Sequence, residues 1–213
     1  MKRDQIATLL LFLFCFTCLL ASPASGQTTP RTPTEFRAER DAEFRNPRTS
    51  PLETWEVAKF TGLKYFEIDP SFRLRATFVR TPNEKKFNMP TSSGLTKVYL
   101  KYGELNFKVR SKRYKLGVYQ SQALSQTEKY KNYLLIPFTD QTSGKETYGG
   151  GRYIDFEIPS SDVVTLDFNL AYNPSCAYSS RFNCPIPPPE NRLTTKIKAG
   201  EKVYKTHVKV LAN

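Results

Sequence analysis

The sequence predicts a mainly β fold, either a β-sandwich or an open β-barrel of about nine strands, preceded by two short N-terminal helices. Two observations carry this prediction. Apolar and polar residues alternate with a period of two in short segments from residue 72 onward, and helical signals are confined to residues 35–62. The 213 residues, 39% hydrophobic and 24% charged, suit one ordinary domain and exclude a disordered chain, a coiled coil and a collagen.

Both helices are expected before residue 63. Residues 35–46 are rich in helix formers and end before a proline. A second short helix follows at 51–62, because Ser50 can cap it and a proline suits its first position. Residues 27–34, rich in Thr and Pro, read as a flexible leader in front of a single domain over 35–213.

The strands are expected wherever the period of two is clear. They cover residues 72–78, 97–102, 105–110, 114–119, 133–138, 152–158, 164–170 and 203–210. Gly103 and Glu104 are expected to form a turn between the second and the third of these strands. Residues 171–193 contain many prolines and fit no element, so they are expected to form a long, rigid loop of the kind that is often functional.

The N-terminus has the pattern of a secretory signal peptide over residues 1–26. Lys2 and Arg3 precede an apolar stretch over 6–21 that is shorter than the ~20 residues needed to span a bilayer, and small residues precede a cut before Gln27. A retained membrane anchor or a lipidated Cys18 are the alternatives. We therefore expect an exported, periplasmic or secreted protein with no transmembrane anchor after cleavage.

The mature chain would keep two cysteines, Cys176 and Cys184. In an oxidising compartment they are expected to form a disulfide, which would fix one loop. Free thiols and metal ligation remain alternatives. A Cys/His metal site would lack ligands, because His207 is the only histidine, so no metal is expected. His207 lies between lysines and reads as an ordinary exposed histidine, and nothing in the sequence identifies a cofactor.

The formal charge of +12 is spread unevenly, with about +7 on residues 84–119. Nucleic acid is not the expected partner, because the chain reads as exported and the lysines of 97–115 alternate with apolar residues as on the wet face of a sheet. The remaining functional interpretation is attraction to an anionic partner such as a lipid headgroup or a cell-envelope polymer.

Five long motifs dominate the second half of the chain. They are IPFTD (136–140), TSGKETYGGGRY (142–153), DFNLAYNP (167–174), CAY (176–178) and CPIPPPENR (184–192). With shorter matches at 50–52, 62–66 and 91–94, they make the chain resemble the bacterial and archaeal family DUF1684 over about residues 35–205. The function of that family is not established, so the resemblance implies a domain and no activity.

Two acidic residues form the most specific chemical clue. If the strands at 152–158 and 164–170 form a hairpin with their apolar faces matched, Asp155 lies opposite Asp167, and Tyr153 lies beside Asn169. Facing carboxylates repel unless a cation, a proton or an arginine intervenes. This arrangement would suit acid–base catalysis or a hard cation, and a solvent-facing sheet neutralised by Arg or Lys is the alternative.

A glycine run adds a second candidate feature. Residues 149–151 with Arg152 could bind a carboxylate, sulfate or phosphate, or they could form a tight turn or bulge. Tyrosines with amides and acids in a groove would fit a sugar or a peptidoglycan fragment. The candidate binding residues are Asp140, Glu146, Tyr148, Gly150, Arg152, Asp155, Asp167, Asn169, Tyr172, Asn173, Glu190, Asn191 and Arg192.

The sequence thus favours an exported protein that binds a small or carbohydrate-like ligand at a polar site within residues 140–192. One alternative is a hydrolase-type enzyme that uses Asp155 and Asp167. The other is a structural cell-envelope protein whose motifs only brace the fold.

Overall fold

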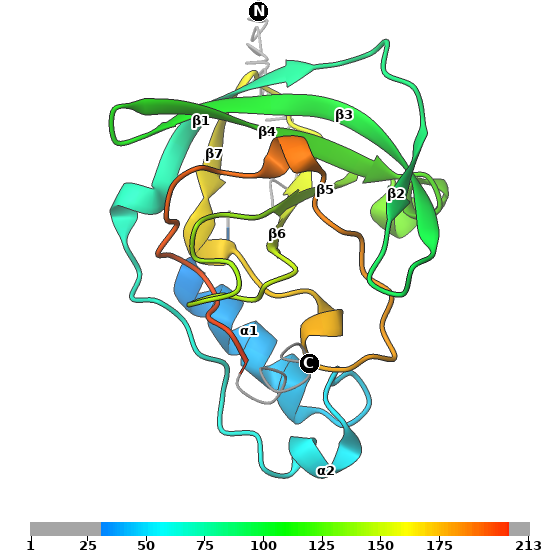
Figure 1. The fold of residues 1–213 in the computed structure, drawn as a ribbon, viewed down its shortest axis with the longest axis vertical. Helices are drawn as coiled ribbons and strands as arrows, with labels where there is room; N and C mark the ends of the chain where they lie inside the picture. Colours follow the sequence, from blue (N-terminus) through cyan, green and yellow to red (C-terminus); the bar gives the residue numbers. More distant parts are fainter. Residues whose placement is uncertain (1–30, 205–213) are drawn as a thin grey trace, which may run out of the picture. The chain divides into compact units, whose positions relative to one another are not determined.

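The computed structural model describes residues 31–204, so the expected signal peptide, His207 and most of the expected strand at 203–210 lie outside the described residues. The strands are β1 (Arg73–Arg80), β2 (Phe87–Pro90), β3 (Thr96–Val109), β4 (Lys112–Ser121), β5 (Tyr133–Phe138), β6 (Arg152–Glu157) and β7 (Val163–Asp167). They form one sheet in the order β6-β5-β4-β3-β1-β7, with β2 paired to β3, and Figure 1 shows that the sheet curls. The mainly β prediction is confirmed in its open-barrel form.

The concave side of the sheet holds the main core. Alternate residues of each strand, such as Phe107, Leu116 and Ile136, point inward and are buried together with Phe168 and Ile197 from the C-terminal third. A second cluster on the outer side of β4, β5 and β6 is rich in tyrosine and includes Cys184. Burial on both sides explains why β5 reads as a nearly continuous apolar run.

The helices are shorter or earlier than expected. The first, α1 (Pro33–Arg45), begins after Thr32, whose side chain caps it in a capping box with Glu35, so residues 33–34 belong to the helix and not to a leader. The second, α2, covers only Thr54–Val57. Single 3-10 turns lie at Pro70–Phe72, Leu124–Gln126, Glu128–Tyr130, Phe168–Leu170, Ser175–Ala177 and Pro189–Asn191.

Gly103 does not form the expected turn, and β3 runs unbroken through it with a bulge between Lys101 and Gly103. The glycine is needed for close packing, because a Cβ atom there would lie 2.5 Å from the Phe78 ring and 2.7 Å from the Val79 carbonyl oxygen. The two expected strands at 97–102 and 105–110 therefore merge into one long strand.

The expected strand at 164–170 ends earlier than the sequence suggests. The Asp167 side chain accepts the Asn169 N–H and turns the chain, so β7 stops at Asp167 and a 3-10 turn follows.

The expected hairpin between 152–158 and 164–170 is wrong. The strand β6 pairs only with β5, and β7 only with β1, so the two strands lie at opposite ends of the sheet order. Residues 158–162 connect these two edges, and Tyr153 pairs with Tyr172 instead of lying beside Asn169. Asp155 and Asp167 consequently do not face each other, and the carboxylate pair expected from the sequence does not exist.

Candidate functional site

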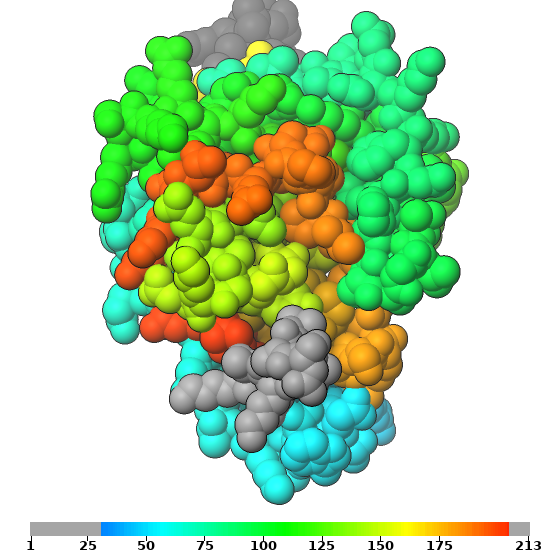
Figure 2. Space-filling view, in the orientation of Figure 1, coloured from blue at the N-terminus to red at the C-terminus, as the bar shows by residue number. Residues whose placement is uncertain are grey.

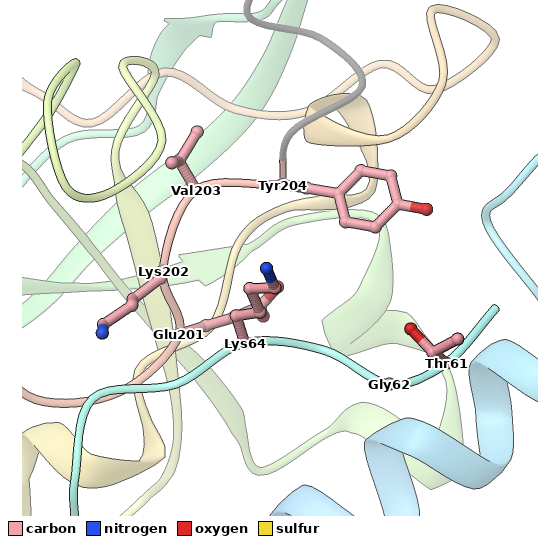
Figure 3. A pocket seen from close by; sticks show the side chains of 7 residues that line it. All are labelled: Thr61, Gly62, Lys64, Glu201, Lys202, Val203 and Tyr204. Atoms are coloured by element: carbon pink, nitrogen blue, oxygen red, sulfur yellow. The ribbon is translucent and has the colours of Figure 1, made fainter.

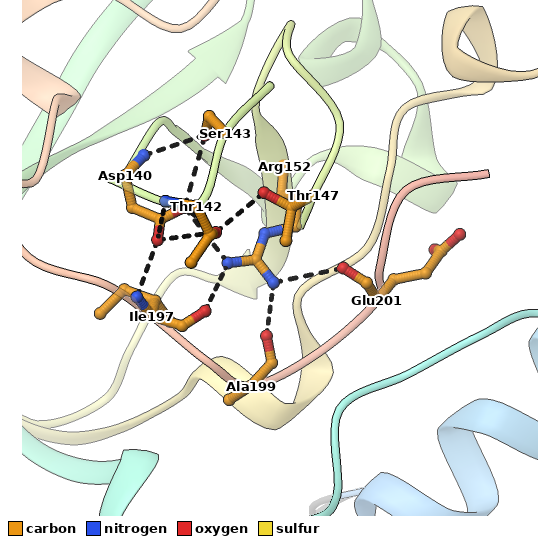
Figure 4. A network of polar contacts seen from close by, with 8 residues as sticks. All are labelled: Asp140, Thr142, Ser143, Thr147, Arg152, Ile197, Ala199 and Glu201. Carbon is orange, nitrogen blue, oxygen red and sulfur yellow. Dashed lines mark hydrogen bonds and ion pairs between the residues drawn. The ribbon is translucent and has the colours of Figure 1, made fainter. Parts of the chain in front are cut away.

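Arg152 is fully buried at the centre of a polar network that includes one other candidate residue, Asp140 (Figure 4). Its Nη2 atom lies 3.3 Å from Asp140 Oδ1 and donates to the Ile197 carbonyl at 2.9 Å. Its Nη1 atom donates to the carbonyls of Ala199 and Glu201. Asp140 in turn accepts the Ile197 N–H at 2.7 Å and bonds from Thr142. These contacts attach the C-terminal segment to the end of β5 and the start of β6. They also occupy both terminal nitrogens of Arg152, the side chain expected from the sequence to bind an external anion.

The C-terminal segment packs directly against the segment that precedes β6. In Figure 2 the orange-to-red segment after residue 185 lies directly against the yellow-green segment that precedes β6. Backbone hydrogen bonds join the two, from Leu193 N–H to the Thr139 carbonyl and from Val203 N–H to the Glu146 carbonyl. These bonds hold the C-terminal segment against part of the region in which the sequence placed a binding site.

Asn191 plays a comparable bracing role between β4 and β5. These strands share a single register pair, and Pro137 has no N–H to donate. The buried Asn191 carboxamide accepts the Gly117 N–H at 2.6 Å and donates to the carbonyls of Gly117 and Pro137. Next to it, Glu190 accepts the Tyr119 hydroxyl at 2.7 Å. One side chain thus replaces the ladder bonds that the two strands lack.

Asp167 and Asn169 hold a turn at the end of β7. Asp167 Oδ1 accepts both the Asn169 N–H and its amide group, and Oδ2 lies 3.8 Å from Arg73. Asn169 also exchanges two hydrogen bonds with the backbone of Asp69. Both side chains are buried, so they stabilise the connection between β7 and the start of β1.

Asp155 is an exposed carboxylate of the candidate set. A single oxygen, Oδ1, accepts the hydroxyls of Tyr133 at 2.7 Å and Tyr172 at 2.5 Å. Burial of the two tyrosines, with the nearby carboxylate, raises the pKa of both hydroxyls. These two hydrogen bonds join β5, β6 and the segment around Tyr172, which follows β7, at the surface.

The remaining candidates are scattered. Glu146 forms an ion pair with Lys198 at 3.3 Å, Gly150 packs against the Tyr148 ring, and Arg192 is exposed. Tyr148 also approaches the Cys176 thiol, with its hydroxyl 3.9 Å from Sγ. These side chains do not share one groove.

The glycine run forms a tight turn. Gly151, at φ +90°, has the left-handed conformation that glycine adopts most readily. A tight turn is one of the two readings that the sequence left open for residues 149–151.

The two cysteines are neighbours. The Cys176 N–H donates to Cys184 Sγ at 3.2 Å, while both residues are free thiols in the structure. Contact with the Cys184 thiol lowers the pKa of Cys176 to about 6, against the effect of burial. The disulfide itself stays a prediction.

A small cavity lies beside Glu201, whose backbone carbonyl belongs to the Arg152 network. It measures about 110 Å³ and lies between two segments, 61–64 and 201–204 (Figure 3). The lining residues are Thr61, Gly62, Lys64, Glu201, Lys202, Val203 and Tyr204. An isolated antiparallel bridge pairs Tyr65 with Glu201, so the two side chains extend from the same side of these segments.

Glu201 carries the electrostatics of this cavity. Its carboxylate accepts the Asn173 N–H at 3.0 Å, the Asn173 amide at 2.9 Å and the Tyr178 hydroxyl. Burial raises the pKa of Glu201, although Arg40 on α1 opposes the shift. Arg40 forms an ion pair with Glu43 at 2.9 Å, and none joins it to Glu201 among the described residues, so Arg40 acts on Glu201 only from a longer distance.

Unpartnered polar atoms concentrate around Glu201. Six buried side-chain nitrogen or oxygen atoms of residues 31–204 have no hydrogen-bond partner, and four of them belong to Arg37, Arg40, Tyr65 and Asn173. Asn173 binds Glu201, and the Arg37 guanidinium stacks over the Tyr65 ring at 4.6 Å. Buried polar atoms without partners are uncommon, and where they gather beside a cavity a water or a ligand completes them. We call Arg40, Tyr65, Asn173, Tyr178 and Glu201 the Glu201 cluster.

Sequence reasoning identifies only Asn173 of the Glu201 cluster. The other members come from separate segments that lack any shared local pattern, and only the fold brings them together. The sequence around Glu201 has no pattern that marks this acid as buried or functional. Within residues 31–204 no three His, Cys, Asp or Glu side chains are grouped to hold a metal ion, and no helix there is long and apolar enough to cross a membrane.

Comparison with known proteins adds a family and a fold. No curated protein matches the chain. The solution structure of an uncharacterised protein from Haloarcula marismortui, gene locus rrnAC0354, is 37% identical, with a TM-score of 0.62 over 80% of this chain and 92% of that one. The family model described as a protein of unknown function, DUF1684, matches residues 58–202. The chain therefore belongs to the DUF1684 family.

Proposed function

We propose that this protein binds a small hydroxylated, carbohydrate-like ligand, one edge of which enters the cavity beside Glu201. The observation that carries the proposal is that Glu201, a buried carboxylate that lines the cavity, belongs to a cluster in which three buried polar atoms, on Arg40, Tyr65 and Asn173, have no hydrogen-bond partner. A cavity of about 110 Å³ holds a few polar groups and not a whole sugar, so the rest of the ligand would lie across the rim.

The chemistry of the cluster suits hydroxyl groups. A hydroxyl can donate to a carboxylate or to an amide oxygen and accept from a tyrosine hydroxyl or a guanidinium, and these are the groups that the Glu201 cluster offers. Arg40, although ion-paired with Glu43, already opposes the charge of Glu201, and a neutral ligand adds no further charge to the site. Lys64 and Lys202 line the cavity as well and could bind a carboxylate substituent of an acidic sugar.

The test is ligand-observed NMR with glucose, N-acetylglucosamine and N-acetylmuramic acid as probes. We expect saturation transfer to at least one probe in the wild-type protein, and its loss in a Tyr65→Phe variant. The matched control is Tyr114→Phe, which removes a hydroxyl at the edge of the main core on β4, a strand that contributes no residue to the cavity. Absence of transfer to all three probes, or equal transfer to both variants, would overturn the proposal and favour a bracing, structural role.

We further propose that the protein is exported by the signal at residues 1–26 and that Cys176 and Cys184 form a disulfide after export. Lys2 and Arg3 with the short apolar stretch support export, and the 3.2 Å contact between the Cys176 N–H and Cys184 Sγ supports the pairing. Intact-mass spectrometry of protein from a bacterial periplasm, with and without reductant, tests both. A chain that begins at Met1, or one whose mass does not change on reduction, would contradict the respective proposal.

A further inference from the structure

The outer face of β1, β3 and β4 gathers exposed positive charge. Strand alternation points Arg73 and Arg75 of β1, Lys108 of β3, and Arg113 and Lys115 of β4 to solvent, since the residues that alternate with them point into the core. Figure 1 shows the three strands side by side along the upper side of the sheet. We call these five residues the cationic face.

The charges of the cationic face are poorly balanced within the protein. Lys108 and Arg113 lie directly opposite each other in the register of β3 and β4. Like charges in such a pair repel and destabilise the sheet, so fold stability does not account for them. Within residues 31–204, Arg75, Lys108 and Arg113 form no ion pair, while Lys115 shares its carboxylate partner, on β3, with another lysine.

The neighbouring carboxylates do not compensate the face. Asp167 contacts Arg73 at 3.8 Å, but its side chain is only 5% exposed and is occupied by Asn169. Glu104 is held at 2.6 Å by Lys101. An external anionic group would therefore meet at least three basic side chains that have no internal competitor.

The shape and the other residues of this face suit an extended surface. It is a sheet face, and neither of the two cavities described among residues 31–204 is lined by any residue of the cationic face. Two exposed valines, Val79 and Val163, extend on the same side of the sheet. Apolar side chains next to basic ones match the headgroup region of a bilayer, whereas a soluble polyanion has no use for them.

We propose that the cationic face docks on a bilayer surface that contains anionic phospholipids. This interaction uses residues on strands that contribute nothing to the Glu201 cluster, and it does not depend on the proposed ligand. Each basic residue close to such a surface strengthens binding by about fivefold, and salt weakens the attraction because it screens exposed charges.

The experiment is co-sedimentation of the mature protein with phosphatidylcholine vesicles, with and without phosphatidylglycerol, at low and at high sodium chloride. The test variant is Arg75→Gln with Lys108→Gln and Arg113→Gln. The matched control removes the same charge elsewhere, as Arg48→Gln with Lys59→Gln and Lys129→Gln, three exposed residues outside the cationic face. Circular dichroism checks that each variant folds, and removal of the Lys108–Arg113 repulsion favours folding of the test variant.

We expect binding only to vesicles that contain phosphatidylglycerol, a loss at high salt, and a weakening of about a hundredfold in the test variant. The control should weaken by no more than about threefold, because net charge acts only at long range. Equal losses in the two variants would overturn the proposal, since net charge alone would then explain binding. Binding to neutral vesicles, or to soluble polyphosphate but not to vesicles, would overturn it too.

Discussion

Glu201 takes part in two buried polar regions, the Arg152 network through its backbone carbonyl and the Glu201 cluster through its side chain. The two regions differ in how many of their polar atoms lack a hydrogen-bond partner. In the Arg152 network a guanidinium contacts a carboxylate at 3.3 Å and three backbone carbonyls, with one unpartnered atom, Arg152 Nε, among the described residues. In the Glu201 cluster no ion pair joins the Arg40 guanidinium to the Glu201 carboxylate among the described residues, and three buried atoms, on Arg40, Tyr65 and Asn173, have no hydrogen-bond partner, while Glu201 itself lines a cavity. A buried polar network that satisfies itself braces a fold, and one that leaves atoms open can bind something.

The largest expected effect comes from breaking the Arg152 network. Replacement of Arg152 by Met leaves Asp140 as an unpaired buried charge and frees three carbonyls, so the free energy of unfolding should fall by about 3–5 kcal/mol. Chemical denaturation measures the loss. The exposed Arg192→Met change is the control and should cost less than about 0.5 kcal/mol. A small effect at Arg152 would show that the region is not a brace.

Asn191 should show the next largest effect. In Asn191→Ala, one N–H and two carbonyls at Gly117 and Pro137 lose their partner in a buried place, which should lower the free energy of unfolding by about 3 kcal/mol. Hydrogen exchange should in addition speed up at the Gly117 amide. Unchanged protection of that amide would contradict the role given to Asn191.

The Glu201 cluster should respond to pH. Because the pKa of Glu201 is raised in the folded protein, its contribution to stability is present below the ordinary glutamate pKa of 4.5 and is lost as the pH rises through the folded pKa. The difference in unfolding free energy between the wild type and Glu201→Gln should therefore change with pH in this direction. Chemical denaturation at a series of pH values measures this difference. A difference that stays constant from about pH 4 to about pH 8 would exclude the raised pKa.

The smallest expected effect is on stability in Tyr65→Phe. The Tyr65 hydroxyl is buried without a partner, so its removal should leave the free energy of unfolding unchanged or raise it by up to about 1 kcal/mol. The melting temperature, measured without ligand, tests this expectation. A clear destabilisation would mean that the hydroxyl already has a hydrogen-bond partner. The Glu201 cluster would then resemble the Arg152 network in having most of its polar atoms partnered.

Much of the fold can be predicted from the sequence because strand alternation and helix caps are local signals. The strand expected at 133–138 has the bounds of β5, and the cap at Thr32 follows a local pattern that lies inside the expected leader. The strand β2 is not predicted, because its four residues are too few to show a period of two. The sequence favours a binding site in the long loops that contain Asp, Asn and Pro. In the structure, most polar side chains of these loops instead form hydrogen bonds with backbone groups inside the fold.

The sequence by itself determined the mainly β class, the family and the positions of the polar motifs, since each depends on neighbours along the chain. Only the tertiary structure decided which polar residues meet. The pairing of β6 with β5 and of β7 with β1 separated Asp155 from Asp167, and a backbone bridge and side-chain hydrogen bonds between distant segments brought Tyr65 and Asn173 to Glu201. Strand order depends on which apolar faces can close around a common core, and that is a property of the whole chain.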